Sequence, residues 1–182
     1  MIFAYILGGL AVVVIALVII IAMQPSEFSV VRSATISAPP SEVFPLVNDF
    51  HNWNAWSPWA KLDPAMKQTY DGAPAGTGAI YTWTGNSQVG EGRMTITESR
   101  PSDLVLINLE FIRPFKATNI TEFTFKPGGE QTTVTWNMSG KKNFIFKAFG
   151  LFMSMDKMVG TDFEKGLGQM KSVAEAKKGG AN

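Results

Sequence analysis

The chain has 182 residues, of which 46% are hydrophobic and 17% are charged, and its formal net charge is +1. A balance so close to neutral gives no footprint for nucleic acid, and the absence of cysteine excludes catalysis through a thiol. The missing cysteines do not identify a compartment, because a cysteine-free domain can exist in oxidising and reducing surroundings alike.

The first segment, Met1 to Met23, is apolar throughout and carries no charged side chain. A helix needs about 20 apolar residues to cross a bilayer, so residues 1–23 are predicted to form one transmembrane anchor helix. A cleaved signal peptide is the first alternative, but it would open on basic residues and end in a small-x-small cleavage site, and neither is present. A buried helix of a soluble domain is the second, although β-branched residues all round the segment leave no polar face for water.

The residues that follow the anchor have the composition of one ordinary soluble domain, predicted over residues 27–178. No proline, glycine or serine tract long enough to separate two domains interrupts them. Arg32 is the only basic residue near the anchor and Glu27 opposes it, so the positive-inside rule leaves the side of the membrane open. Residues 141–178 carry eight lysines against four acidic residues, which indicates a solvated helix face or, alternatively, attraction to anionic lipid headgroups.

The domain is predicted to open with a strand at Glu27–Ile36, which is rich in valine, threonine and serine and stops before two prolines. A short helix with one apolar face is expected from Ser41 to Val47. The next stretch, Asp49 to Trp59, concentrates aromatic side chains and is predicted to be a second helical turn or a structured loop.

From residue 66 the pattern changes to short alternating runs separated by turn residues, which is typical of an antiparallel meander. Six strands are predicted there: Met66–Tyr70, Ala79–Trp83, Val89–Glu98, Leu104–Phe111, Ala117–Lys126 and Gln131–Met138. Turn residues, such as Asp71 with Gly72, stand where the alternation stops. Together with the first strand, these runs predict a seven-stranded sheet.

The C-terminal part of the chain changes to a helical period. A short helix is expected over Phe144–Met153, and apolar residues recur every three or four positions from Met155 to Ala174, which predicts a long amphipathic helix. Gly160, Gly166 and Gly168 interrupt this helix at a propensity cost of about 1 kcal/mol each. We therefore expect either a close neighbouring backbone at these glycines or a bent helix.

Residue motifs within this order of elements resemble a known family. Trp53 to Trp59 with Asp63-Pro64, Gly76 to Gly78 and Gly90 to Gly92 are similar to the polyketide cyclase and dehydrase-like subgroup of the START-like helix-grip superfamily, SRPBCC. The resemblance covers residues 28–176 and implies an α+β fold in which a curved antiparallel sheet of seven strands wraps the long C-terminal helix. The superfamily, which also contains lipid-transfer START domains and birch-pollen allergens, includes binders, carriers and a few enzymes, so it implies the fold more specifically than the function.

The usual catalytic constellations are missing from the sequence. His51 is the only histidine, no serine stands in a nucleophile-elbow motif, and neither clustered metal ligands nor a complete phosphate-binding loop occurs. We therefore predict no catalytic residue, no metal site and no cofactor.

Strand glutamates are the remaining candidates for acid or base chemistry, because a carboxyl group in a dry cavity has a raised pKa. These residues are Glu91, Glu98, Glu110 and Glu122. If its strand alternates regularly, at most one of Glu91 and Glu98 points inward. The alternative is a surface pair, for example of Glu91 or Glu122 with Arg93.

Apolar residues that alternate along the strands are expected to face the long helix. Because helix-grip sheets commonly leave a cavity beneath this helix, the resemblance implies an open cavity for a hydrophobic ligand, and a solid core is the alternative. The candidate cavity residues are His51, Trp56, Tyr81, Trp83, Met94, Ile96, Phe123, Phe125, Trp136, Met138 and Phe163. Trp53, Trp56 and Trp59 are expected to cap the core, with a cavity gate or a membrane-interface contact as alternatives.

These features predict a membrane-anchored domain that binds or presents a hydrophobic small molecule, for instance a lipid, without catalysing a reaction. One alternative is an enzyme of the polyketide cyclase or dehydratase type that uses a strand glutamate or His51 as base. Another is an interaction module of a membrane complex. The short link between Met23 and the first strand favours local capture at the membrane over long-distance carriage, and no nucleic-acid partner is expected.

Overall fold

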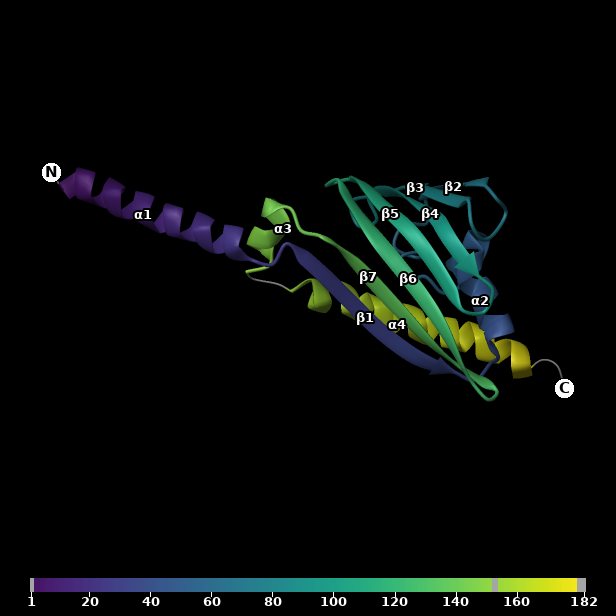
Figure 1. Ribbon diagram of the computed structural model, residues 1–182. Helices are drawn as coiled ribbons and strands as arrows, with labels where there is room; N and C mark the ends of the chain where they lie inside the picture. Colours follow the sequence, from purple (N-terminus) through teal and green to yellow (C-terminus); the bar gives the residue numbers. More distant parts are fainter. Residues whose placement is uncertain (1, 152–153, 180–182) are drawn as a thin grey trace.

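The computed structural model describes residues 2–151 and 154–179. An N-terminal helix, seven antiparallel strands and a long C-terminal helix are its main elements (Figure 1). The helical elements are α1 (Ile2–Met23), α2 (Pro40–Asn48), the 3-10 helix η1 (Phe50–Ala55), α3 (Phe144–Phe149) and α4 (Met155–Gly179). The strands are β1 (Glu27–Ile36), β2 (Lys67–Gly72), β3 (Ala79–Thr84), β4 (Glu91–Arg100), β5 (Leu104–Arg113), β6 (Ala117–Gly128) and β7 (Gln131–Lys141).

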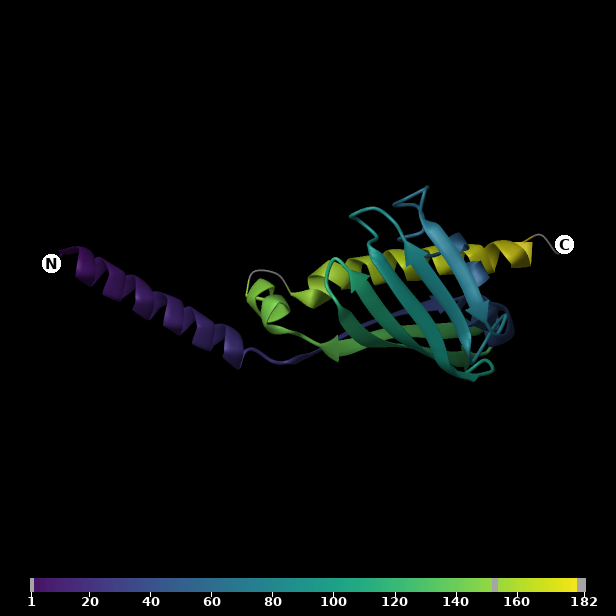
Figure 2. The same ribbon diagram turned by 90° about the horizontal axis from the view of Figure 1, so that it is seen from above.

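The strands form one sheet in the order β1-β7-β6-β5-β4-β3-β2, and all neighbouring strands are antiparallel. The sheet curls around α4, which lies along its concave face (Figures 1 and 2). The first and last strands pair along all of β1, from Glu27 opposite Lys141 to Ile36 opposite Thr132. The seven-stranded α+β helix-grip fold expected from the sequence is therefore confirmed.

Helix α4 is bonded to the β1 segment near both of its ends. At the end next to α3, the Arg32 guanidinium donates to Asp156 at 2.8 Å and to Glu164 at 2.6 Å. At the other end, the Glu175 carboxylate accepts from the backbone N–H of Ser37, directly after β1, at 2.7 Å. The helix is therefore held against the edge strand along its length.

Two of the three glycines in α4 lie where another part of the chain comes close. A Cβ at Gly160 would meet the Arg32 guanidinium, and one at Gly166 would meet the Trp136 ring at 2.9 Å. The neighbours at these two positions are side chains, so the expected close approach of another backbone is wrong there. It is also wrong at Gly168, where a Cβ would have no neighbour within 4 Å.

The short helix expected before α4 is present in part. Residues Phe144–Phe149 are helical, and the Asn143 side chain begins this helix by accepting from the Phe146 N–H at 2.9 Å. Phe152 and Met153, which were expected to belong to it, lie outside the described residues.

Packed apolar side chains fill the concave face at the end of the sheet away from α1, and we call this region the filled half. Helix α2 lies over the sheet here, beside the C-terminal part of α4 (Figure 1). Phe44 of α2 packs edge-on against Phe125 of β6, with 5.4 Å between the ring centroids. Other buried members of the filled half are Val43, Val47, Ala79, Ile96, Ile107, Leu167, Met170 and Ala174.

Helix α1 projects away from the sheet, and its described side chains are exposed except for Ile21 (Figure 1). The stretch from Tyr5 to Met23 is long and apolar enough to cross a membrane, and 6% of it is buried against the rest of the chain. The last turn of α1 meets α3, where Lys147 Nζ donates to the Ala22 carbonyl at 3.1 Å. The domain therefore begins directly beside the C-terminal end of α1.

Candidate functional site

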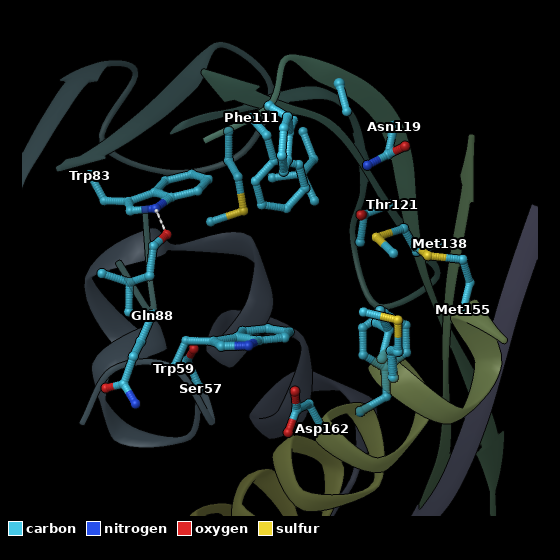
Figure 3. A pocket seen from close by; sticks show the side chains of 18 of the residues that line it. Ser57, Trp59, Trp83, Gln88, Phe111, Asn119, Thr121, Met138, Met155 and Asp162 are labelled. Atoms are coloured by element: carbon cyan, nitrogen blue, oxygen red, sulfur yellow. Dashed lines mark hydrogen bonds between the residues drawn. The ribbon is translucent and has the colours of Figure 1, made fainter. Parts of the chain in front are cut away.

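A cavity of about 500 Å³ lies between the concave face of the sheet and the first half of α4. Side chains from β3 to β7, the segment around η1, the β3–β4 and β5–β6 loops, α3 and the start of α4 form its wall (Figure 3). We call this part of the concave face the open half. It lies nearer to α1 than the filled half does, because its rim includes α3 and the first residues of β1.

Large apolar side chains dominate the wall of the cavity. Trp59, Trp83 and Phe111 present aromatic rings to the space, and Met138 and Met155 present thioethers (Figure 3). Methionine is unbranched and polarizable, so a wall of this kind adapts to apolar molecules of different shapes. The lining therefore has the composition of a site for a hydrophobic small molecule.

Stacked aromatic rings separate the open half from the filled half. Trp136 lies flat on Phe163 of α4, with 3.8 Å between the ring centroids and 8° between the ring planes. Trp136 also stacks on Phe123 at 4.9 Å and meets Trp56 edge-on at 5.6 Å. The helix can approach this cluster because Gly166 has no side chain.

The Trp83 indole is fixed by the chain around it. Its Nε1 donates to the Val89 carbonyl at 2.9 Å, the bond drawn as a dashed line in Figure 3. Gly92 of β4 lies against the ring so closely that a Cβ there would collide with it. With its only donor already bonded, Trp83 offers a ligand an apolar surface and no hydrogen bond.

Two buried side-chain polar atoms on the wall, Thr121 Oγ1 and Trp136 Nε1, have no hydrogen-bond partner in the described part of the chain. An unpaired buried polar group costs free energy, so a ligand oxygen that reaches either atom gains a bond that the empty protein lacks. Burial, and to a smaller extent Tyr70, raises the pKa of the Tyr81 phenol above its ordinary value. Tyr81 is therefore neutral at physiological pH and can donate a proton in a hydrogen bond.

Six of the eleven candidate cavity residues lie on the wall: Tyr81, Trp83, Met94, Trp136, Met138 and Phe163. The five on strands occupy inward positions of β3, β4 and β7, as their alternation along the chain predicted. Trp53 and Trp59 of the tryptophan-rich segment line the cavity as well. Trp56 is buried behind them, where its Nε1 donates to the Leu46 carbonyl at 2.7 Å.

Four candidates belong to the packed core and not to the cavity wall. Trp56, Ile96, Phe123 and Phe125 are each at most 2% exposed. Their strand or loop positions face inward as expected, but α2 and the aromatic cluster around Trp136 cover this part of the sheet. The assignment of these residues to the cavity is corrected accordingly.

His51 is also displaced from its expected position at the cavity. Its ring stacks on Tyr70 with 4.1 Å between the centroids, and its Nδ1 lies 2.8 Å from an Asp49 oxygen. Within η1 neighbouring side chains point in different directions, so Phe50 is buried whereas His51 is exposed. His51 is therefore on the outer surface and does not line the cavity.

None of the four strand glutamates lines the cavity. The register of β4 shifts between Ile96 and Glu98, which places Glu98 on the surface, 3.3 Å from the Arg100 guanidinium. Glu91 forms a cross-strand ion pair with Arg113 of β5, so the expected surface pair is present, although the partner of Glu91 is Arg113 and not Arg93.

Asp162 of α4 is the one carboxylate on the wall among the residues that the structure describes. It is partly exposed, and its Oδ1 lies 3.5 Å from Lys165 Nζ. No group of three potential metal ligands occurs among the residues described.

The sequence did not reveal the side chains that loops and α3 contribute to the wall. Phe115 from the β5–β6 loop and Phe146 from α3 meet edge-on with 6.1 Å between the ring centroids, and both line the cavity. Gln88, from the β3–β4 loop, lines the cavity as well (Figure 3). The only signal of the two phenylalanines in the sequence was their position next to turn residues, which does not indicate a direction.

A comparison of the sequence with known families identifies the family of the domain. The chain belongs to the family described as polyketide cyclase / dehydrase and lipid transport, whose family model matches residues 27–175. This match leaves α1 outside the family's own sequence. No curated protein matches the chain in sequence.

Several solved structures share the fold at low sequence identity. Protein CV1439 from Chromobacterium violaceum is 14% identical over 81% of this chain and 96% of its own, with a TM-score of 0.59. TTHA0849 from Thermus thermophilus is 16% identical over 82% of this chain and 99% of its own, also with a TM-score of 0.59. DynU16, a protein in the dynemicin biosynthetic locus, is 20% identical over 81% of this chain and 47% of its own, with a TM-score of 0.57. Likenesses at this identity establish the fold alone.

Proposed function

We propose that this protein is a membrane-anchored helix-grip domain, with residues 1–23 as anchor and residues 27–178 as domain, that binds a hydrophobic small molecule or lipid without catalysing a reaction. The observation that carries the proposal is the open cavity of about 500 Å³ between the sheet and α4. Small-molecule sites are typically hollows of about 300–1,000 Å³ with mainly apolar walls and a few polar groups. The family description, which includes lipid transport, supports the same class of ligand.

The anchor rests on the composition and the exposure of α1. A buried core helix would hide this apolar surface, whereas 6% of the Tyr5–Met23 stretch is buried. At a rise of about 1.5 Å per residue, a helix of this length matches the hydrocarbon thickness of a bilayer.

The placement of the ionisable groups favours binding over catalysis. The glutamates that could have acted as cavity acids or bases lie outside the wall, and His51 lies on the outer surface. The inward polar atoms of Thr121 and Trp136 suit recognition of a ligand oxygen, because they are unpaired and neutral.

A cyclase or dehydratase is the second candidate, and Asp162 is the observation that favours it. This carboxylate is on the wall, at the first half of α4, where an acid or base would face a bound aromatic precursor. Loss of turnover in Asp162→Asn with binding retained would support the enzyme. Unchanged turnover would show that Asp162 is not its acid or base.

Native mass spectrometry of the full chain, purified from its own host, tests the binding function. We expect a fraction of the protein to carry the additional mass of an apolar molecule. Ala117, on the wall, and Ala55, which is exposed and is not part of the wall, provide a matched pair of variants. Ala117→Trp should lose the additional mass and Ala55→Trp should keep it, and folded wild-type protein that is consistently empty would overturn the proposal.

A further inference from the structure

Four apolar side chains gather at the α1 end of the domain without being buried by it. Phe144, Ile145 and Phe149 of α3 are 51%, 48% and 57% exposed, and Phe115 of the β5–β6 loop is 47% exposed. We call these four residues the α3 patch. None of the residues of α3 is buried, so packing against the domain does not explain its apolar composition. Contiguous exposed apolar groups of this kind mark an interaction surface.

The α3 patch lies next to the end of α1. Lys147 of α3 donates to the carbonyl of Ala22, in the last turn of α1, at 3.1 Å. Figure 1 shows α3 beside this end of α1, on the side of the domain opposite the C-terminus. Because the end of a membrane-spanning helix lies at the boundary between acyl chains and headgroups, α3 lies at the same depth.

Basic side chains accompany the α3 patch. Lys116 follows Phe115 in the β5–β6 loop, Lys141 and Lys142 precede α3, and Lys147 lies within it. Glu27 of β1 lies opposite Lys141 in the sheet. Apolar residues combined with lysines complement a surface of anionic lipid, in which acyl chains lie below negative headgroups.

Exposed residues next to α1 also line the cavity. Phe115 of the α3 patch and Phe146 of α3 are both on its wall, and their rings meet edge-on. Pro114 and Met158, both exposed, line it beside them. A molecule that passed between the β5–β6 loop and α3 would therefore move between the surface next to α1 and the cavity.

We propose that the α3 patch docks into the headgroup–acyl boundary of the bilayer that holds α1, and that ligands enter the cavity from this bilayer between Phe115 and α3. The inference rests on the anchor and cavity of the proposed function. It adds the surface that touches the lipid and the route by which the cavity is filled.

Depth-dependent fluorescence quenching tests the docking. The chain has no cysteine, so single cysteines at exposed positions can carry a bimane label in the full chain without a background. Test positions are Phe115→Cys, Ile145→Cys and Phe149→Cys, in vesicles of phosphatidylcholine and phosphatidylglycerol that contain doxyl-labelled lipid. Ile20→Cys reports insertion of α1, and Val31→Cys is the matched control, because Val31 is 47% exposed but lies on the edge strand outside the α3 patch.

We expect labels in the α3 patch to be quenched several-fold more than the Val31 label. Quenching at Ile20 with patch labels that behave like Val31 would overturn the docking and leave the anchor in place. An unquenched label at Ile20 would overturn the anchor instead, so the two failures are distinguishable.

Transfer of a fluorescent fatty acid, cis-parinaric acid, from vesicles to the full chain tests the entry route. The Phe144→Asp/Phe149→Asp variant changes residues outside the cavity wall, so it should fill several-fold more slowly but to the same final level, while Val31→Asp should match the wild type. Circular dichroism checks that each variant is folded. Filling of all three folded proteins at equal rates would overturn the entry route, whereas a wild type that does not fill at all would overturn binding in the cavity instead.

Discussion

The open half and the filled half of the concave face differ in what covers them, not in the strands that build them. β6 contributes Thr121 to the cavity wall and Phe125 to the packed core, four residues apart on the same face. In the filled half α2 and the C-terminal part of α4 close over the sheet, whereas the open half has loops and the short α3 at its rim. The concave face of this sheet therefore keeps a cavity under the first half of α4, where α2 does not cover it.

The largest expected difference in the free energy of unfolding comes from truncating one phenylalanine in each half. Phe125 is 2% exposed in the filled half, so Phe125→Ala should lower the free energy of unfolding by about 3–5 kcal/mol. Phe111 is partly exposed on the cavity wall and already lacks neighbours on one side, so Phe111→Ala should cost about 1–2 kcal/mol. Urea unfolding of the chain from residue 27 onward measures both. Equal costs would contradict the division into two halves.

Replacing one alanine in each half by leucine should give the next largest difference in stability. Ala79 and Ala117 are the first residues of β3 and β6, and they lie in the filled half and on the cavity wall respectively. Ala79→Leu should destabilise the domain by about 1–3 kcal/mol through overpacking. Ala117→Leu should leave stability nearly unchanged and weaken binding of cis-parinaric acid in a titration. A destabilised Ala117→Leu would mean that the cavity cannot accept added volume.

Replacing two buried threonines by valine should change the free energy of unfolding in opposite directions. Thr132 donates to the Ala38 carbonyl at 2.7 Å, so Thr132→Val should cost about 1–2 kcal/mol by leaving that carbonyl unpaired. The Thr121 hydroxyl has no hydrogen-bond partner among residues 2–151 and 154–179, so Thr121→Val should stabilise the empty domain by about 1 kcal/mol. Thermal unfolding of both variants without ligand measures the signs. A destabilising Thr121→Val would show that its hydroxyl is satisfied.

Low pH should weaken the contacts that hold both ends of α4 to the β1 segment. We expect this change in stability to be smaller than the three changes described above. The Arg32 guanidinium lowers the pKa of Asp156, at the start of α4, and Lys171 with the Ser37 N–H lowers that of Glu175, near its end. Because each folded-state pKa lies below the unfolded value of about 4, these contacts stabilise above that pH and are lost as the pH falls through the folded-state pKa.

Asp156→Asn and Glu175→Gln should therefore each reduce the stability lost between neutral pH and acid. The urea midpoint at neutral pH compared with the midpoint at acid pH gives this loss for each protein. A loss as large as that of the wild type would show that neither carboxylate contributes to the acid sensitivity.

The sequence predicted the strands and their inward faces well, because alternation is a local property. β3, β4, β5 and β7 begin and end within about three residues of the predicted positions, and Tyr81, Trp83 and Met138 do face inward. The division into two halves is not local. Phe125 and Met138 have similar alternation, and only the position of α2 decides that one is in the core and the other on the wall.

Irregular backbone explains the other errors. The register shift between Ile96 and Glu98 turned one glutamate to the surface, and the turn of η1 did the same to His51. The rim residues Phe115 and Phe146 come from a loop and a six-residue helix, where no period indicates direction. Such positions depend on contacts between distant parts of the chain.

The bonds between α4 and the β1 segment also determine when the cavity can exist. During synthesis the strands are made before Asp156 and Glu175. Since the cavity is bounded by α4, it is complete only after α4 reaches Arg32 and Ser37. On the proposed function, a ligand would therefore enter a finished domain and not the growing chain.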